Sequence, residues 1–263
     1  MTEPAHTIRI RVDAKNPGQF FACCGLLELA ARLRPGAMAC FETADFLVSE
    51  GPSLETLLAE IVDARLEKLD PEDVTASPIR VSGPFDLRLD WWKGGDRASS
   101  DLKVWAGTME SFRIARAMQN ALRAPEFCTA EMFNIGTVAF DPDDAETKVE
   151  PFYFDARRGP NAHSRDVGFA PNDLGMTTIA SPAVELLCLI GLQRVRPVSA
   201  GKPRLFDYHT WSLSLPPELA PAAAAGLLPD AGPRGYRFES WFRTGQRKHK
   251  AFITAKPITE HQT

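Results

Sequence analysis

One stretch of the sequence, residues 154–166, gathers side-chain types that bind phosphates. It contains three arginines, a histidine, a serine and two aspartates beside a Gly-Pro pair: Arg157, Arg158, Arg165, His163, Ser164, Asp155, Asp166, Gly159 and Pro160. A guanidinium group binds phosphate oxygens through two parallel hydrogen bonds, and a Gly-Pro turn exposes backbone amides. The stretch therefore predicts a phosphate or RNA-backbone contact through Arg157, Arg158, His163 and Arg165. The alternative is an ordered loop held together by its own Asp–Arg pairs.

His163 also allows an enzymatic interpretation of the same stretch. A histidine base activates a ribose 2′-hydroxyl, and neighbouring arginines stabilise the phosphorane that forms during RNA cleavage. Such a reaction needs a second acid or base, and no other histidine has a recognisable spacing to His163. We therefore assign no catalytic residue, and a metal-independent endoribonuclease that uses His163 remains the alternative.

Two further groups of cations are predicted to contact RNA. Arg113, Arg116 and Arg123 share one face of a predicted helix, which is either an RNA-facing ridge or an ordinary solvated face. Residues 241–250 resemble a basic hairpin, because they combine two aromatic residues with four cations around a glycine. The four cations are Arg243, Arg247, Lys248 and Lys250.

Tryptophan and cations also alternate within residues 91–105. Single-stranded nucleic acids bind to such mixtures, because bases stack on flat rings while phosphates meet the cations. The alternative is that the rings fill the core, which is the commoner position for tryptophan. The residues concerned are Trp91, Trp92, Trp105, Lys93, Arg97 and Lys103.

Charge is distributed unevenly along the chain of 263 residues, whose net charge is −4. Residues 42–73 contain ten acidic and two basic side chains, whereas residues 232–257 contain seven basic side chains and only Glu239 as an acid. A protein that coats nucleic acid on every side is therefore excluded, and a local basic surface is favoured.

Motifs for cofactors and metals are missing from the sequence. There is no Walker loop, no G-x-G-x-x-G after a strand, no H-E-x-x-H, no G-x-S-x-G and no zinc-type Cys/His spacing. The five cysteines are scattered among apolar residues, as is typical of buried thiols in a reducing compartment. We therefore expect no cofactor and no metal. No apolar run is long enough to span a bilayer, so we expect a cytoplasmic protein with no membrane partner.

Local patterns predict the elements that position these side chains. Helices are expected where apolar residues repeat at helical spacing, over residues 20–33, 54–69, 109–123 and 183–194, the first of them with Asn16 as N-cap and Gln19 at the capping-box position. Strands are expected where polar and apolar residues alternate: residues 8–12, one or two within 40–48, an antiparallel pair at 79–81 and 85–91, then 136–140, 149–155, 208–215, 236–242 and 251–254. Residues 216–229 are expected to form a surface excursion. The pattern predicts an α+β protein with an antiparallel sheet and one domain over residues 1–263.

Two stretches of the sequence resemble a known protein family. Residues 16–30, Asn-Pro-Gly-Gln-Phe-Phe-Ala-Cys-Cys-Gly-Leu-Leu-Glu-Leu-Ala, and residues 152–175, which include Asn-Ala-His-Ser-Arg-Asp-Val-Gly-Phe, are similar to the Csb group encoded with type I-U CRISPR loci. Residues 103–107 and 182–197 are similar to the same family. The resemblance covers most of residues 16–197.

The resemblance implies a fold and a role. Members of this group are placed among the RAMP proteins, so it implies a ferredoxin-like, RRM-like βαββαβ core with an antiparallel sheet, packed helices and long insertions. It implies a non-catalytic, guide-RNA-binding structural subunit of a Cascade-like surveillance complex in antiviral defence, beside a separate helicase-nuclease. The implied partners are CRISPR guide RNA, other Cascade subunits and possibly target DNA. A guide-processing endoribonuclease and a protein-only adaptor remain alternatives.

Overall fold

The computed structural model describes residues 6–158, 178–243 and 247–258. The helices are α1 (Pro17–Leu33), α2 (Leu54–Asp63), α3 (Arg97–Leu102), α4 (Ser111–Ala121), α5 (Pro182–Arg194) and α6 (Ala220–Ala224). The strands are β1 (His6–Arg11), β2 (Met38–Glu42), β3 (Asp45–Ser49), β4 (Leu66–Lys68), β5 (Ile79–Val81), β6 (Leu87–Leu89), β7 (Phe140–Asp141), β8 (Asp144–Lys148), β9 (Val198–Ser199), β10 (Leu205–Thr210), β11 (Arg234–Phe242), β12 (Lys250–Phe252) and β13 (Lys256–Pro257).

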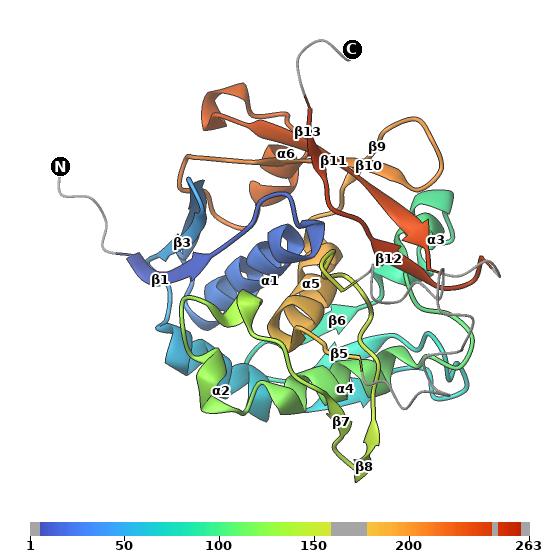
Figure 1. Cartoon of the computed structure of the whole chain (residues 1–263). Helices are drawn as coiled ribbons and strands as arrows, with labels where there is room; N and C mark the ends of the chain where they lie inside the picture. The colour runs from blue at the N-terminus through green and yellow to red at the C-terminus, as the bar shows by residue number, and fades with distance from the viewer. Residues whose placement is uncertain (1–5, 159–177, 244–246, 259–263) are drawn as a thin grey trace.

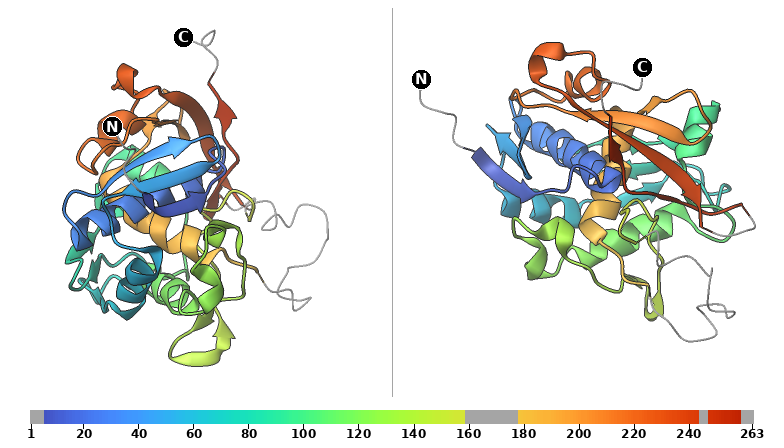
Figure 2. Two further views of the ribbon diagram at one scale, coloured as in Figure 1. Left: turned by 90° about the vertical axis from the view of Figure 1, so that its left-hand side faces the viewer. Right: turned by 45° about the horizontal axis from the view of Figure 1, so that its top comes forward.

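Helices α1 and α5 lie side by side in the middle of the molecule, with small antiparallel sheets around them (Figure 1). The strand orders are β1-β3-β2, β4-β5-β6 and β12-β11-β10-β9, with β13 also paired to β11, and β7 pairs with β8. The β9–β13 sheet lies on one side of the helix pair, and β5, β6 and α4 lie on the other (Figures 1 and 2). The chain is thus an α+β protein, as the sequence predicts.

Helix α1 begins where its sequence signals place it. The Asn16 side chain accepts a hydrogen bond from the Gly18 amide, and Pro17 occupies the first turn, where no amide is needed. The capping-box prediction for Gln19 is wrong, because its side-chain oxygen accepts from the Asp13 amide instead. Gln19 therefore fixes the β1–α1 connection rather than the helix end itself.

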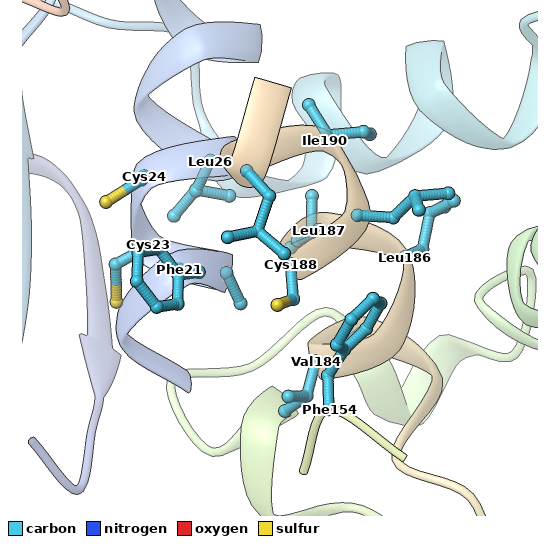
Figure 3. Close-up of a cluster of buried hydrophobic side chains, with 14 of the residues drawn as sticks. Phe21, Cys23, Cys24, Leu26, Phe154, Val184, Leu186, Leu187, Cys188 and Ile190 are labelled. Carbon is cyan, nitrogen blue, oxygen red and sulfur yellow. The ribbon is translucent and has the colours of Figure 1, made fainter. Parts of the chain in front are cut away.

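Two glycines allow α1 and α5 to approach until their backbones touch. A Cβ atom on Gly25 would lie 2.0 Å from the Leu187 carbonyl oxygen, and one on Gly191 would lie 1.9 Å from the Phe21 carbonyl oxygen. Apolar side chains of both helices fill the space around this contact (Figure 3). No other residue type fits at either position without moving one helix, so the glycines set the spacing of the central pair.

The first sheet has a crossover topology. Helix α1 connects β1 to β2, and β3 returns between them, so that β3 pairs antiparallel with both. This β-α-β-β arrangement is the first half of a split βαβ motif. The other edge of β1 pairs with none of the described strands. The backbone after β10 instead bonds to β2, since the Ala39 amide donates to the Leu215 carbonyl oxygen.

The five-stranded sheet has one buried and one partly exposed face. On β10, Phe206, Tyr208 and Thr210 are buried, and the residues between them are half-buried. The buried face packs on α1, where the Tyr208 and Phe20 rings stack with centroids 4.4 Å apart. We call the opposite side, which carries Glu239 and Trp241 of β11, the outer face. An antiparallel sheet of this kind is free to use one face for binding.

Three predicted elements, one helix and two strands, are corrected. The predicted helix over residues 54–69 ends at Asp63, because residues 66–68 form β4 and pair with β5. The strands predicted at 136–140 and 149–155 are replaced by the β7–β8 hairpin. Residues 149–155 form no described strand, and the amides of Phe154 and Asp155 bond instead to the Glu185 carboxylate. The remaining predicted helices and strands appear within a few residues of their expected positions.

Candidate nucleic-acid interface

The arginines at the start of the 154–166 stretch are tied to the protein itself. The fully buried Asp155 carboxylate accepts from the Arg157 guanidinium, with Nη2 2.7 Å from Oδ2, and from the Asn16 side chain at 2.7 Å. Burial alone would raise the pKa of Asp155, but hydrogen bonds from Arg157, Ser181 and Asn16 hold it below the usual value. Arg158 bonds to the Ser181 hydroxyl. This geometry corresponds to the loop held by its own Asp–Arg pairs. His163 and Arg165 lie outside the described residues.

A second buried acid, Glu185, lies at the start of α5 and has no motif that reveals it. Its two carboxylate oxygens accept from the Phe154 and Asp155 amides at 3.2 and 3.1 Å. Burial raises its pKa to about 8, and the neighbouring Asp155 charge adds to the shift. Glu185 and Asp155 therefore hold residues 153–157 against the N-terminal ends of α1 and α5.

The arginine face of α4 meets an acidic hairpin. Arg113 pairs with Asp141, Arg116 pairs through two bonds with Asp143, and Arg123 pairs with Asp63 of α2. The two partners of Arg113 and Arg116 belong to the β7–β8 hairpin, which lies beside α4 (Figure 1). Carboxylates therefore already occupy the positions that phosphates would need on this face.

The tryptophans of residues 91–105 belong to the core, so the interpretation as base-stacking rings is wrong. Trp91 and Trp105 are 1 % exposed and Trp92 is 6 % exposed, and the three rings contact one another edge to face. Each indole N–H donates to a backbone carbonyl oxygen, of Leu189, Ala76 and Thr75. With both ring faces and the N–H satisfied, no surface is left for a base.

The four cations of residues 241–250 divide into two pairs. Arg243 and Lys250 are 8 % and 7 % exposed: the Arg243 guanidinium lies over the Tyr153 ring at 3.7 Å, and the Lys250 ammonium donates to the Ser100 carbonyl oxygen. Burial lowers the pKa of Lys250 to about 8. Contrary to the prediction, this pair serves packing. Arg247 and Lys248 are exposed and form no ion pair within the described residues; we call the β11–β12 connection that carries them the basic hairpin.

Arg204, which the sequence analysis did not single out, joins three segments at the outer face. Its amide donates to the Asp101 carboxylate of α3, and its carbonyl oxygen accepts from the Ser240 amide of β11. Its guanidinium lies 4.7 Å from the Phe242 ring centroid and 5.8 Å from that of Trp241. The Nε atom is buried and has no hydrogen-bond partner in the part of the chain that the structure describes. Trp241 is 38 % exposed, so one cation and one accessible ring lie together.

A cavity of about 490 Å³ opens beside Arg204; we call it the basic cavity. Three cationic side chains and one carboxylate line it: Arg97, Lys202, Arg204, Pro203, Leu205 and Glu239. Lys202 is exposed, and the Arg97 side chain is 77 % exposed and lies 3.6 Å from Asp101. Guanidinium and ammonium groups around a cavity suit a phosphate, and the Trp241 ring near Arg204 suits an attached base. The only sequence signal was the Gly-Lys-Pro-Arg order at 201–204, which is too short to be specific.

Within residues 6–158, 178–243 and 247–258, no three His, Cys, Asp or Glu side chains come together in a way that could hold a metal ion. The helices in these residues also lack the length and apolar character that a membrane span requires. Comparison with known proteins gives no match: no family model, no curated protein and no solved structure matches this chain.

Proposed function

We propose that this chain is a non-catalytic, guide-RNA-binding structural subunit of a type I-U CRISPR surveillance complex. The observation that carries the RNA-binding part is the outer face, where Arg204 lies between an exposed tryptophan and a cavity lined by Arg97 and Lys202. Cations supply the salt-dependent affinity for phosphates, and an exposed ring supplies base stacking that tolerates any sequence. Such a surface suits a guide whose bases must stay free to pair with a target.

The CRISPR context of the proposal comes from the resemblance of residues 16–30 and 152–175 to the Csb group. The β1-α1-β2-β3 topology, with the order β1-β3-β2, supports a core related to the ferredoxin-like RAMP fold. In this proposal the partners are guide RNA and other Cascade subunits in the cytoplasm, with target DNA as a further contact.

The experiment is binding of purified protein to labelled CRISPR repeat RNA over a salt series, with the products separated on a denaturing gel. Replacing Lys202 and Arg204 together by alanine removes two cations of the basic cavity. The salt slope is the slope of log K against log salt concentration. We expect its magnitude to fall by about two and the affinity at about 50 mM salt to fall about 10- to 100-fold.

The matched control removes two cations elsewhere. Arg65 and Arg80 belong to the region of the β4-β5-β6 sheet, are exposed, and each pairs with a carboxylate. Their double alanine variant has the same net charge as the first variant, so equal loss of affinity in both would contradict a local site on the outer face.

The two alternatives give different results on the same gel. An endoribonuclease would cut the repeat RNA and lose cleavage, but not affinity, on His163→Ala. A protein-only adaptor would bind no RNA even at low salt and would still co-purify with the other subunits. Intact, salt-sensitive complexes support the binding subunit.

A further inference from the structure

Glu239 is an unusual lining residue for a cavity that binds phosphate. It is the one acid among residues 232–257 and lies on the outer face of β11, opposite Leu205 of β10. It lines the basic cavity with Arg97, Lys202 and Arg204. Within the residues that the structure describes, its carboxylate forms no ion pair within 4 Å and accepts no side-chain hydrogen bond. The cavity therefore contains an acceptor group that the protein leaves open.

The neighbouring carboxylate on the same face, Asp207, does have a cationic partner. Asp207 accepts two hydrogen bonds from Arg237, at 2.7 and 2.8 Å, so its charge is matched within the sheet. Glu239 follows Arg237 by two residues on the same side of β11, yet it is not matched in this way. If the basic cavity bound phosphate alone, this carboxylate would repel the ligand. A ligand that also carries a hydrogen-bond donor would turn the repulsion into a bond.

The spacing on β11 indicates which part of a nucleotide supplies that donor. Trp241 and Glu239 are two residues apart on one face, which is about 7 Å along a strand. Arg204 and Glu239 both line the basic cavity, so a nucleotide whose phosphate is bound by Arg204 has its ribose within reach of Glu239. The donor at that place in RNA is the 2′-hydroxyl, which DNA lacks.

We propose that Glu239 accepts a hydrogen bond from a ribose 2′-hydroxyl and thereby makes the outer face selective for RNA over DNA. This inference rests on the proposed function and names the ligand class of the same site. In RNA the hydroxyl donates its hydrogen to a Glu239 carboxylate oxygen. In DNA the carboxylate has no donor and faces the phosphates across the cavity, so binding is weaker.

The experiment compares three single-stranded probes of one sequence: oligouridine RNA, oligodeoxyuridine DNA, and 2′-O-methyl oligouridine, which keeps the 2′-oxygen but has no hydroxyl proton to donate. We expect the full chain to bind the RNA about tenfold more tightly than either other probe, the size of one charge-assisted hydrogen bond. Glu239→Ala should reduce the ratio of RNA affinity to DNA affinity to about one. Glu239→Gln, which keeps a carbonyl acceptor, should retain part of this preference.

Glu55→Ala serves as the matched control, since it removes one exposed acid from α2 and should leave the ratio unchanged. Circular dichroism confirms that each variant is folded. Equal binding of all three probes by the unaltered protein would overturn the inference and leave the proposed function standing. A Glu239→Ala variant that binds RNA and DNA more tightly by the same factor would also overturn it, because the carboxylate would then only repel phosphate. Failure to bind any probe would overturn both proposals.

Discussion

The arginine face of α4 and the outer face of the five-stranded sheet both carry cations, but these cations differ in how they are paired. On α4, Arg113 and Arg116 each meet an aspartate of the β7–β8 hairpin. At the outer face, the Arg204 guanidinium has aromatic rings and a cavity for neighbours, and its Nε has no partner in the described part of the chain. Pairing within the protein, more than the number of cations, distinguishes the two faces.

The largest predicted effect is on stability and concerns the two buried acids. Asp155 pairs with the Arg157 guanidinium, whereas Glu185 accepts hydrogen bonds from backbone amides. Glu185 has a pKa of about 8 in the folded protein, so between about pH 5 and pH 8 the folded state binds more protons than the unfolded state. Stability should therefore fall as the pH rises through this window, by on the order of 4 kcal/mol in total. Urea unfolding of the protein and of Glu185→Gln, which cannot ionise, measures this; equal pH dependence in both would refute the assignment.

The next largest effect on stability is expected when the Arg157 guanidinium is removed from the buried Asp155 carboxylate. Arg157→Ala removes the closer of two guanidinium groups from the buried Asp155 carboxylate and leaves Arg158 at 3.9 Å, which should destabilise the protein by about 3 kcal/mol in urea unfolding at neutral pH. Adding Asp155→Asn removes the poorly compensated charge and should recover part of the loss. A single variant as stable as the unaltered protein would mean that the pair carries no structural role.

A smaller effect on affinity, with none on stability, is expected at the basic hairpin. Arg247 and Lys248 are exposed and lack ion pairs within the described residues. Their double alanine variant should bind repeat RNA about tenfold more weakly at low salt, and its salt slope should fall by about two. An unchanged affinity, with an unchanged midpoint of unfolding, would restrict the interface to the outer face.

The smallest effect is expected on α4. Arg113→Ala with Arg116→Ala removes two cations that aspartates already neutralise, so RNA affinity should change less than about threefold and stability by at most about 1 kcal/mol. If this variant loses as much RNA affinity as the Lys202 and Arg204 variant, then the acidic hairpin moves away when RNA binds and the comparison fails.

Elements with local signals could be predicted from the sequence. Asn16 and Pro17 define the start of α1, and the alternation at residues 8–12 defines β1, because both signals depend on neighbouring residues alone. Leu66 and Leu69 fit a helical stripe as well as a strand, so the pattern could not show that pairing with β5 ends α2 at Asp63. Tertiary pairing decided between two equally good local patterns.

The candidate site was less predictable than the fold. Whether Arg243 is buried over Tyr153, or Arg113 neutralised by Asp141, depends on residues 90 and 28 positions away. Arg204 carried no specific local signal, since its contacts come from β11 and α3 meeting at the 200–204 turn. The sequence also could not separate the exposed Arg247 and Lys248 from the buried Arg243 and Lys250, because all four lie in one stretch with the same lack of nearby carboxylates.

The contact of Gly25 with α5 has a consequence for how the chain is made. Glu28 of α1 and Arg194 of α5 pair although they are 166 residues apart, and the helices between these ends touch backbone to backbone. A ribosome therefore releases an apolar helix long before the segment that covers it exists. Until α5 emerges, the face of α1 that packs against it lacks its cover, and a protein cut short before residue 182 would leave that face exposed and prone to aggregate.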